Sequence, residues 1–308
     1  MKNLKNIIFV LVVIAFIFAI TTLSNKTQNG DGVSKPMVSL STFSLYDIAR
    51  HVAGDKVRLV MILPFGVDPH SFEPTPKLMA KISNSKLVVY SGAGLEPWTD
   101  GFDFKGRVID MSHHVKLRKL DSHHHHDKNH HSSKFDPHYW LDISNMILAT
   151  NLITDELIKI SPQNKELYLK NRDSYIKTLN KLDDDYKKTL SSCRGNTIIV
   201  NHNAFSYMAN NYNFHVEALS GLSPEAQPSA KKMIELIGHV KEHNISTVFF
   251  ESFVSDKAIK SIAGEAKVGV DVLQPLGNIT ADEAKQKLSF EDIMRENLQK
   301  IAKGLKCR

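Results

Sequence analysis

Three histidines lie in settings that would suit a metal ligand. His70 and His138 each follow an Asp-Pro pair, and His202 lies between two asparagines. Proline fixes φ and restricts the residue before it, so each Asp-Pro-His segment presents its histidine on a stiff backbone. One such histidine alone would more often be a surface or structural residue. Three of them, in two cases with the same local motif, favour a shared zinc site, because zinc binds imidazole nitrogen in tetrahedral sites.

The positions of these histidines relative to the expected strands support a shared site. His70 and His202 each follow an apolar run that predicts a buried strand, at residues 57–63 and 197–200. Ligand-binding loops of α/β sheets lie beyond the carboxyl ends of strands. His138 is followed by a Tyr-Trp-Leu run that would anchor it to a buried element and limit water access. The alternatives are a core role for His202 and membership of His138 in the histidine-rich segment before it.

The elements that would position these histidines alternate between strand-like and helix-like segments. Strands are expected at residues 37–41, 57–63, 87–91, 107–111, 197–200, 247–250 and 268–272, and helices at 45–52, 77–82, 143–159, 229–242, 257–266 and about 290–303. This order predicts parallel strands with crossover helices. The expected fold class is therefore α/β with two lobes, each a mostly parallel sheet flanked by helices.

One long helix is expected to join the lobes. Ser161 suits an N-cap, Pro162 suits the first helical position, and tyrosines and leucines recur at helical spacing up to Gly195. Nearly thirty residues at about 1.5 Å per residue would reach roughly 43 Å. A coiled-coil dimer is the weaker alternative, because the apolar seam lasts only about three heptads. The expected segments are a leader (1–24), a polar tether (25–36), an N-terminal lobe (37–160), a linking helix (161–192) and a C-terminal lobe (193–308).

The start of the chain has the pattern of a secretion signal. Lys2 and Lys5 precede an uncharged apolar run at residues 7–20, which is shorter than the roughly 20 residues that span a bilayer. We expect a cleaved signal, with an uncleaved membrane anchor as the alternative. In an oxidising compartment, Cys193 and Cys307 would form one disulfide or remain two separate thiols. The net charge of +6 comes without Lys and Arg interleaved with aromatics, which gives no support to nucleic-acid binding.

A second histidine signal lies in residues 113–131. This segment has almost no core-forming residue after Leu120, which predicts a mobile loop. Neutral imidazoles at this density bind zinc, nickel and copper with modest selectivity. The candidate auxiliary ligands are His123, His124, His125, His126, His130 and His131. We expect this loop to collect or sense metal at low affinity, so that its deletion leaves the main site intact; an internal expression tag is the alternative.

The motifs together resemble one family. The Asp-Pro-His-Ser-Phe-Glu-Pro-Thr-Pro stretch at residues 68–76 is similar to the first metal motif of the ABC-transporter solute-binding proteins that take up zinc or manganese. Similar blocks follow in order: Asp55 after Ala53-Gly54, Asp136-Pro137-His138-Tyr139-Trp140-Leu141-Asp142, Asn201-His202-Asn203-Ala204-Phe205, Phe249-Phe250-Glu251 and Pro275-Leu276-Gly277. The resemblance implies a monomeric periplasmic protein with a rigid spine helix, which delivers its ion to an inner-membrane permease and has no organic substrate.

The fourth metal ligand is where the chain departs from this family. Relatives usually place an aspartate where this chain has Gln274, so the Gln274 amide oxygen, a water molecule and another carboxylate remain open. Glu251 ends a predicted strand and would orient a histidine by accepting a hydrogen bond from its ring N–H group, or else would serve as a helix-start or salt-bridge residue. Three nitrogens without an assigned carboxylate favour zinc over manganese. Because all three histidines must be neutral, uptake should weaken below about pH 6.

The leading hypothesis is therefore high-affinity zinc capture for an ABC permease, without catalysis. A manganese- or iron-binding member of the same family is an alternative. A three-histidine zinc hydrolase or hydratase is another, with Glu251 as its only candidate general base. A metal buffer or surface adhesin that uses the histidine-rich loop is the remaining class.

Overall fold

The computed structural model describes residues 35–120, 134–221, 229–252 and 255–308. The chain divides into two compact units, Met1–Lys35 and Pro36–Arg308, and both sheets belong to the second. The predicted leader, the tether up to residue 34 and the auxiliary histidines at 123–131 lie outside the described residues. Within the described part, no helix is long and apolar enough to cross a membrane.

The N-terminal lobe is built on a parallel four-stranded sheet. Its strands are β1 (Met37–Leu40), β2 (Arg58–Met61), β3 (Leu87–Tyr90) and β4 (Arg107–Asp110), in the order β2-β1-β3-β4. Helices α2 (Phe43–Ala53) and α3 (Pro76–Ile82) connect the first three strands. The central strand β1 is buried along its whole length, as expected for a parallel strand that is covered on both faces.

The C-terminal lobe repeats this arrangement. Its parallel strands are β5 (Thr197–Val200), β6 (His215–Ala218), β7 (Thr247–Phe250) and β8 (Gly269–Val272), in the order β6-β5-β7-β8, and its helices are α6 (Ser206–Tyr212), α7 (Ala230–Glu242) and α8 (Lys257–Ala266). Sequence reasoning missed β6 and α6. The four residues of β6, His-Val-Glu-Ala, lie at the sheet edge and are partly or fully exposed, so they lack the apolar run that marks a central strand.

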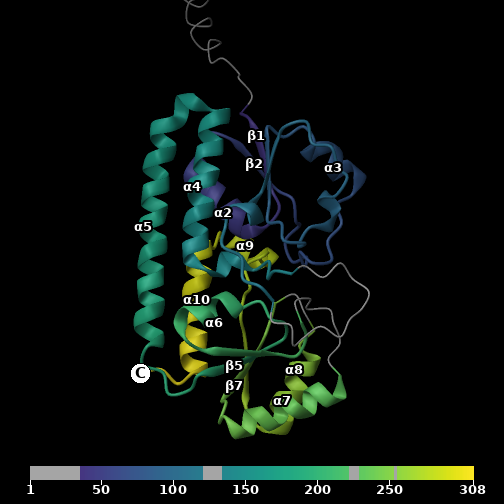
Figure 1. Ribbon diagram of the computed structural model, residues 1–308, viewed down its shortest axis with the longest axis vertical. Coiled ribbons are helices and arrows are strands. Elements are labelled where there is room, and N and C mark those ends of the chain that lie inside the picture. The colour runs from purple at the N-terminus through teal and green to yellow at the C-terminus, as the bar shows by residue number, and fades with distance from the viewer. Residues whose placement is uncertain (1–34, 121–133, 222–228, 253–254) are drawn as a thin grey trace, which may run out of the picture. The chain divides into compact units, whose positions relative to one another are not determined.

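Three of the described helices are long, and one of them extends along both lobes. These are α4 (Ile143–Ile160), α5 (Lys165–Leu190) and α10 (Phe290–Gly304), while the short α9 (Ala281–Lys285) precedes α10. Figure 1 shows α4 and α5 side by side, with α5 extending from the level of one sheet to that of the other. The 26 residues of α5 correspond to about 39 Å. The long linking helix and the α/β fold class are thus confirmed, although Ser161-Pro162 opens a separate 3-10 turn and not α5 itself.

The apolar side of α5 packs within the same chain. Six of its side chains are buried: Tyr168, Tyr175, Leu179, Leu182, Tyr186 and Leu190. They pack in one hydrophobic core that continues from β1 in the N-terminal lobe to β5 in the C-terminal lobe. The helix contacts α2, α4 and α10. The residues that suggested a coiled-coil seam are therefore core residues of a single chain.

The chain after β8 returns to the N-terminal lobe. The backbone N–H of Gly66 donates to the carbonyl oxygen of Ile279 at 2.9 Å. The side-chain amide of Asn278 donates to the carbonyl oxygens of Pro64 and Val67, each at 2.7 Å. The loop that carries His70 is therefore held by a segment that emerges from the other sheet.

A disulfide joins Cys193 to Cys307. Cys193 follows the end of α5, and Cys307 lies three residues beyond α10. This disulfide connects the end of the long helix to the C-terminal tail. Of the two alternatives that the sequence left open, one disulfide or two separate thiols, the structure has the disulfide.

Candidate metal centre

Three imidazole rings converge between the two sheets. His70 lies in the loop after β2, His138 precedes the 3-10 turn Tyr139–Leu141, and His202 follows β5. Nε2 of His138 lies 3.2 Å from Nε2 of His70 and 3.3 Å from Nε2 of His202. Two nitrogens bound to one tetrahedral zinc ion at about 2.0–2.1 Å would be roughly 3.3 Å apart. The arrangement therefore has the spacing of a three-histidine zinc site, and each residue offers one ligand atom within 4.8 Å of the others.

The two Asp-Pro-His motifs share a local structure. The carboxylate of Asp68 accepts a hydrogen bond from the backbone N–H of His70 at 3.2 Å, and Asp136 accepts from that of His138 at 2.9 Å. An aspartate that binds the backbone two residues on forms an Asx turn, with the proline between them. The motif thus orients its histidine by a local backbone turn, formed among three consecutive residues.

Carboxylates hold the far side of two of the rings. Nδ1 of His138 donates to Asp136 at 2.7 Å, and Nδ1 of His202 donates to Glu251, the first residue after β7. A carboxylate can only accept, so the proton of each neutral ring lies on Nδ1 and the lone pair of Nε2 faces the cluster. The predicted orienting contact of Glu251 is present in the structure.

Electrostatics differ among the rings. Burial lowers the pKa of His70 well below its usual range, and repulsion from His138 and His202 adds to this effect. Burial also lowers the pKa of His202, but the charge and hydrogen bond of Glu251 outweigh it, so the net pKa is raised. At neutral pH, His70 is therefore neutral and ready to coordinate, whereas His202 holds a proton more strongly than a free histidine.

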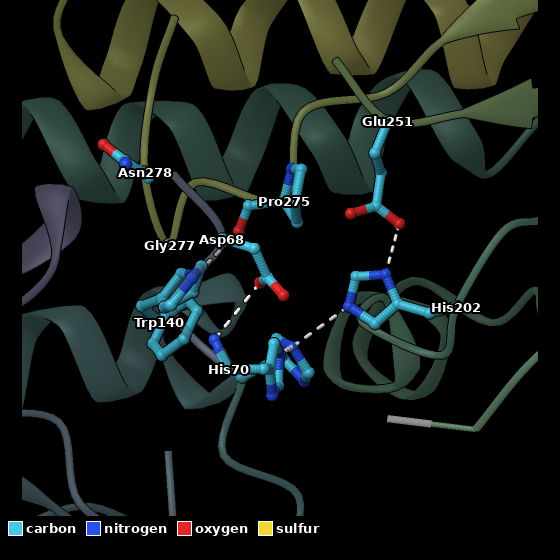
Figure 2. Close-up of a pocket in the computed structure, with 10 residues that line it drawn as sticks. Asp68, His70, Trp140, His202, Glu251, Pro275, Gly277 and Asn278 are labelled. Atoms are coloured by element: carbon cyan, nitrogen blue, oxygen red, sulfur yellow. Dashed lines mark hydrogen bonds and ion pairs between the residues drawn. The ribbon is translucent and has the colours of Figure 1, made fainter. Parts of the chain in front are cut away.

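The pocket between the rings is small and largely enclosed by side chains. Its lining consists of Asp68, Pro69, His70, His138, Trp140, His202, Glu251, Pro275, Gly277 and Asn278 (Figure 2). The cavity volume is about 20 Å³, close to that of a single water-sized ligand. The site can therefore take a monatomic ion with little additional solvent.

Residues from both lobes contact one another in the wall of the pocket. The indole N–H of Trp140 donates to the carbonyl oxygen of Pro275 at 2.7 Å. A Cβ atom on Gly277 would lie 3.1 Å from Pro69 and 3.3 Å from Trp140, a tighter approach than most side chains accept. Glycine at this position lets the returning segment close against the aromatic wall.

Comparison with known proteins places the chain in a family. Residues 38–304 match the family model described as "Zinc-uptake complex component A periplasmic". The chain belongs to this zinc-uptake family. The family resemblance predicted from the motifs is thereby confirmed.

Two curated relatives of the zinc-uptake family illustrate the match. The zinc-binding lipoprotein AdcA of Streptococcus pneumoniae is 30% identical over 97% of this chain, and the chain spans 60% of that relative's length. The high-affinity zinc uptake system protein ZnuA of Bacillus subtilis is 30% identical over 96% of both chains.

A solved structure agrees with the fold of this member of the zinc-uptake family. The Zn(II)-bound ZnuA-like domain of S. pneumoniae AdcA superposes with a TM-score of 0.75 at 31% identity, covering 88% of this chain and 99% of that one. The two-lobe architecture is therefore that of a zinc-binding relative.

Gln274, the candidate fourth ligand, does not line the pocket described above. Its side-chain NH2 group donates to the carboxylate of Glu283 at 3.0 Å, whereas its oxygen Oε1 is buried without a hydrogen-bond partner among the described residues. The Asp68 carboxylate, by contrast, points toward the imidazoles in Figure 2. Sequence reasoning overlooked Asp68, although it stands two residues before His70 in the same motif.

Proposed function

We propose that this protein captures Zn²⁺ outside the cytoplasm and delivers it to the permease of an ABC transporter. The observation that carries the proposal is the convergence of three Nε2 atoms at the spacing of zinc ligands. Membership of a family described as a zinc-uptake complex component supports the transport role. The leader expected at residues 1–24 supports a periplasmic location, and the family description, which names a periplasmic component, agrees with it.

The ligands in this proposal are His70, His138 and His202, with Zn²⁺ as cargo. The fourth position is filled by an oxygen atom, from the Asp68 carboxylate or from a water molecule, because Asp68 lines the pocket and Gln274 does not. Three imidazole nitrogens favour zinc, since manganese prefers sites richer in oxygen.

The ion would cross-link the lobes. His70 and His138 come from the N-terminal side of the chain, and His202 follows the first strand of the second sheet. A permease can distinguish loaded from empty protein only when the two differ in shape or order. An ion bound by residues of both lobes provides such a difference, because removing the ion leaves the three imidazoles, two of them buried, without their common partner.

The cavity argues against the hydrolase alternative. A catalytic zinc needs an open position beside room for a substrate, and about 20 Å³ does not accommodate an organic molecule. Glu251, the one candidate general base, already accepts the Nδ1 proton of His202. We therefore favour a carrier role without a reaction.

Metal competition on the full chain tests this proposal. Zinc affinity would be measured against a high-affinity chelator, with and without excess manganese, for the unaltered protein and for His70→Ala, His138→Ala and His202→Ala. His215→Ala is the matched control, since this exposed histidine lies at the start of the edge strand β6. We expect each pocket substitution to abolish tight zinc binding and the control to leave it unchanged. Tight binding that survives all three pocket substitutions would refute the site.

A further inference from the structure

A second pair of histidines lies on α7, on the C-terminal lobe (Figure 1). His239 is in the last turn of this helix, and His243 is its C-cap residue. The backbone N–H of His243 donates to the carbonyl oxygen of His239 at 2.9 Å, so the helical turn continues through both residues. Side chains four residues apart on a helix share one face. The helical spacing therefore places the two imidazole rings next to each other.

The ring geometry of this pair is similar to that of one pair in the central cluster. The ring centroids of His239 and His243 are 5.9 Å apart at an interplanar angle of 84°. In the central site, the rings of His70 and His202 are 5.7 Å apart at 82°. Two imidazoles at this separation can direct one nitrogen each toward a common ion.

A carboxylate orients one member of the pair. Nδ1 of His239 donates to Glu217 of the edge strand β6 at 2.5 Å. As for His138 with Asp136 and His202 with Glu251, this contact fixes the proton on Nδ1 and leaves the Nε2 lone pair for a ligand. The same carboxylate–histidine arrangement thus occurs a third time, outside the pocket.

The electrostatic surroundings favour a cation. The hydrogen bond to Glu217 raises the pKa of His239, and Glu235 and Glu242 add to this effect. The pair also lies at the C-terminus of α7, where the helix dipole places partial negative charge. The side chain of His239 is about one-third exposed and His243 is exposed, so an ion could reach them directly from solvent.

We propose that His239 and His243 bind a zinc-class divalent cation at a second, solvent-exposed site, with Glu217 as the residue that positions His239. Water molecules complete the coordination of the ion. With two protein ligands, this site holds zinc more weakly than the three-histidine pocket does. The C-terminal lobe can therefore hold an additional zinc ion at its surface while the pocket is occupied.

Site-resolved NMR on the full chain tests the proposal. The pocket is first filled with one equivalent of Zn²⁺, and more Zn²⁺ is then added while the imidazole C–H resonances of His239 and His243 are followed. These resonances are assigned from the single substitutions. We expect both to shift with one common midpoint, distinct from the response of the other histidines.

Three variants separate a built site from incidental binding. His243→Ala should remove the shift of His239 or raise its midpoint by at least about tenfold, because one of two ligands is lost. Glu217→Gln should raise the midpoint by about tenfold, as loss of an orienting carboxylate does at other metal sites. The control His215→Ala, on the same strand as Glu217, should change neither resonance.

The outcomes for the two sites are independent. His70→Ala should empty the pocket and leave the midpoint at His239 unchanged. If the resonances of His239 and His243 shift at different zinc concentrations, or if His243→Ala leaves the response of His239 intact, the second site does not exist, whatever the result for the pocket.

Discussion

The hydroxyl group of Ser206 donates a hydrogen bond to the carboxylate of Asp136 across the two lobes. Ser206 begins α6, whereas Asp136 belongs to the motif that precedes α4. The other carboxylate oxygen of Asp136 accepts from Nδ1 of His138 at 2.7 Å. The orientation of one candidate ligand in the first lobe therefore depends on a side chain of the second.

Ser206→Ala should weaken zinc binding without removing any ligand. Asp136 would lose one donor, and the ring of His138 would be held less firmly. Loss of a residue that supports a metal ligand typically costs about 10-fold to 100-fold in affinity, and we expect the lower end here because Asp136 remains. Chelator competition measures the change. Ser191→Ala, at an exposed position after α5, is the control, and an affinity equal to that of this control would contradict the prediction.

Glu251→Gln should have a larger effect. The amide keeps the size of the side chain but removes the charge that raises the pKa of His202 and holds its Nδ1 proton. We expect zinc affinity to fall by about 10-fold to 100-fold. Glu265→Gln, on the exposed side of α8, should have no effect. Equal zinc affinities for the two variants would show that Glu251 does not support the site.

Zinc affinity should decline as the pH falls. A proton competes with the ion for Nε2 of His202, and the pKa of His202 is raised above its usual value of about 6.5. His70 adds no competition at that stage, because its pKa is lowered. The onset therefore lies above the value of about pH 6 that the sequence suggests. Measured between pH 5 and 8, the curve for Glu251→Gln should shift to lower pH; an unshifted curve would exclude His202 as the competing base.

The stability of the metal-free protein should fall in acid because of His70. The unfolded chain takes up a proton near pH 6.5, whereas the native state keeps His70 neutral to a lower pH. The unfolded state then binds more protons, so the free energy of unfolding decreases as the pH falls below 6.5. His202 has the opposite sign: its contribution is full below about pH 6.5 and is lost as the pH rises through its raised pKa. Urea denaturation should show a shallower acid loss for His70→Ala and a steeper one for His202→Ala.

Asp68→Asn tests the fourth position. Asparagine keeps an oxygen that can accept from the backbone of His70, so the Asx turn is preserved while the negative charge is removed. We expect at least about a tenfold loss of zinc affinity, because an oxygen ligand or a charge next to the ion is lost. Gln274→Ala should leave zinc affinity unchanged, since Gln274 does not line the pocket. A loss seen only for Gln274→Ala would reverse this assignment.

The disulfide should contribute to stability and not to zinc binding. Cys193 and Cys307 are 114 residues apart, so their link restricts the unfolded chain over a long loop. Replacing both with serine should lower the free energy of unfolding by about 2–5 kcal/mol, measured by chemical denaturation. Adding a reductant to the unaltered protein should reproduce the loss. A change in zinc affinity would show that the link also positions the pocket.

Most elements followed from the sequence because their signals are local. Apolar runs marked the central strands such as β1 and β5, and helical spacing marked α5 over its whole length. The edge strand β6 was missed because half-exposed polar residues carry no such pattern. The start of α5 was placed too early, because Ser161-Pro162 supports a 3-10 turn as well as an α-helix.

The sequence by itself indicated the three histidines: His70 and His138 by the Asp-Pro-His motif, which builds its turn from neighbouring residues, and His202 by its place after a predicted strand. Only the tertiary structure decided which oxygen atoms surround them. Gln274 is directed to Glu283, and Asp68 and Glu251 line the pocket. The pocket depends on how two sheets and a returning segment pack; the hydrogen bond from Asn278 to Pro64, for example, joins residues that are 214 positions apart. A turn formed by neighbouring residues can be predicted from the sequence. Which of several similar polar side chains reaches the pocket depends on long-range packing, which the sequence pattern does not show.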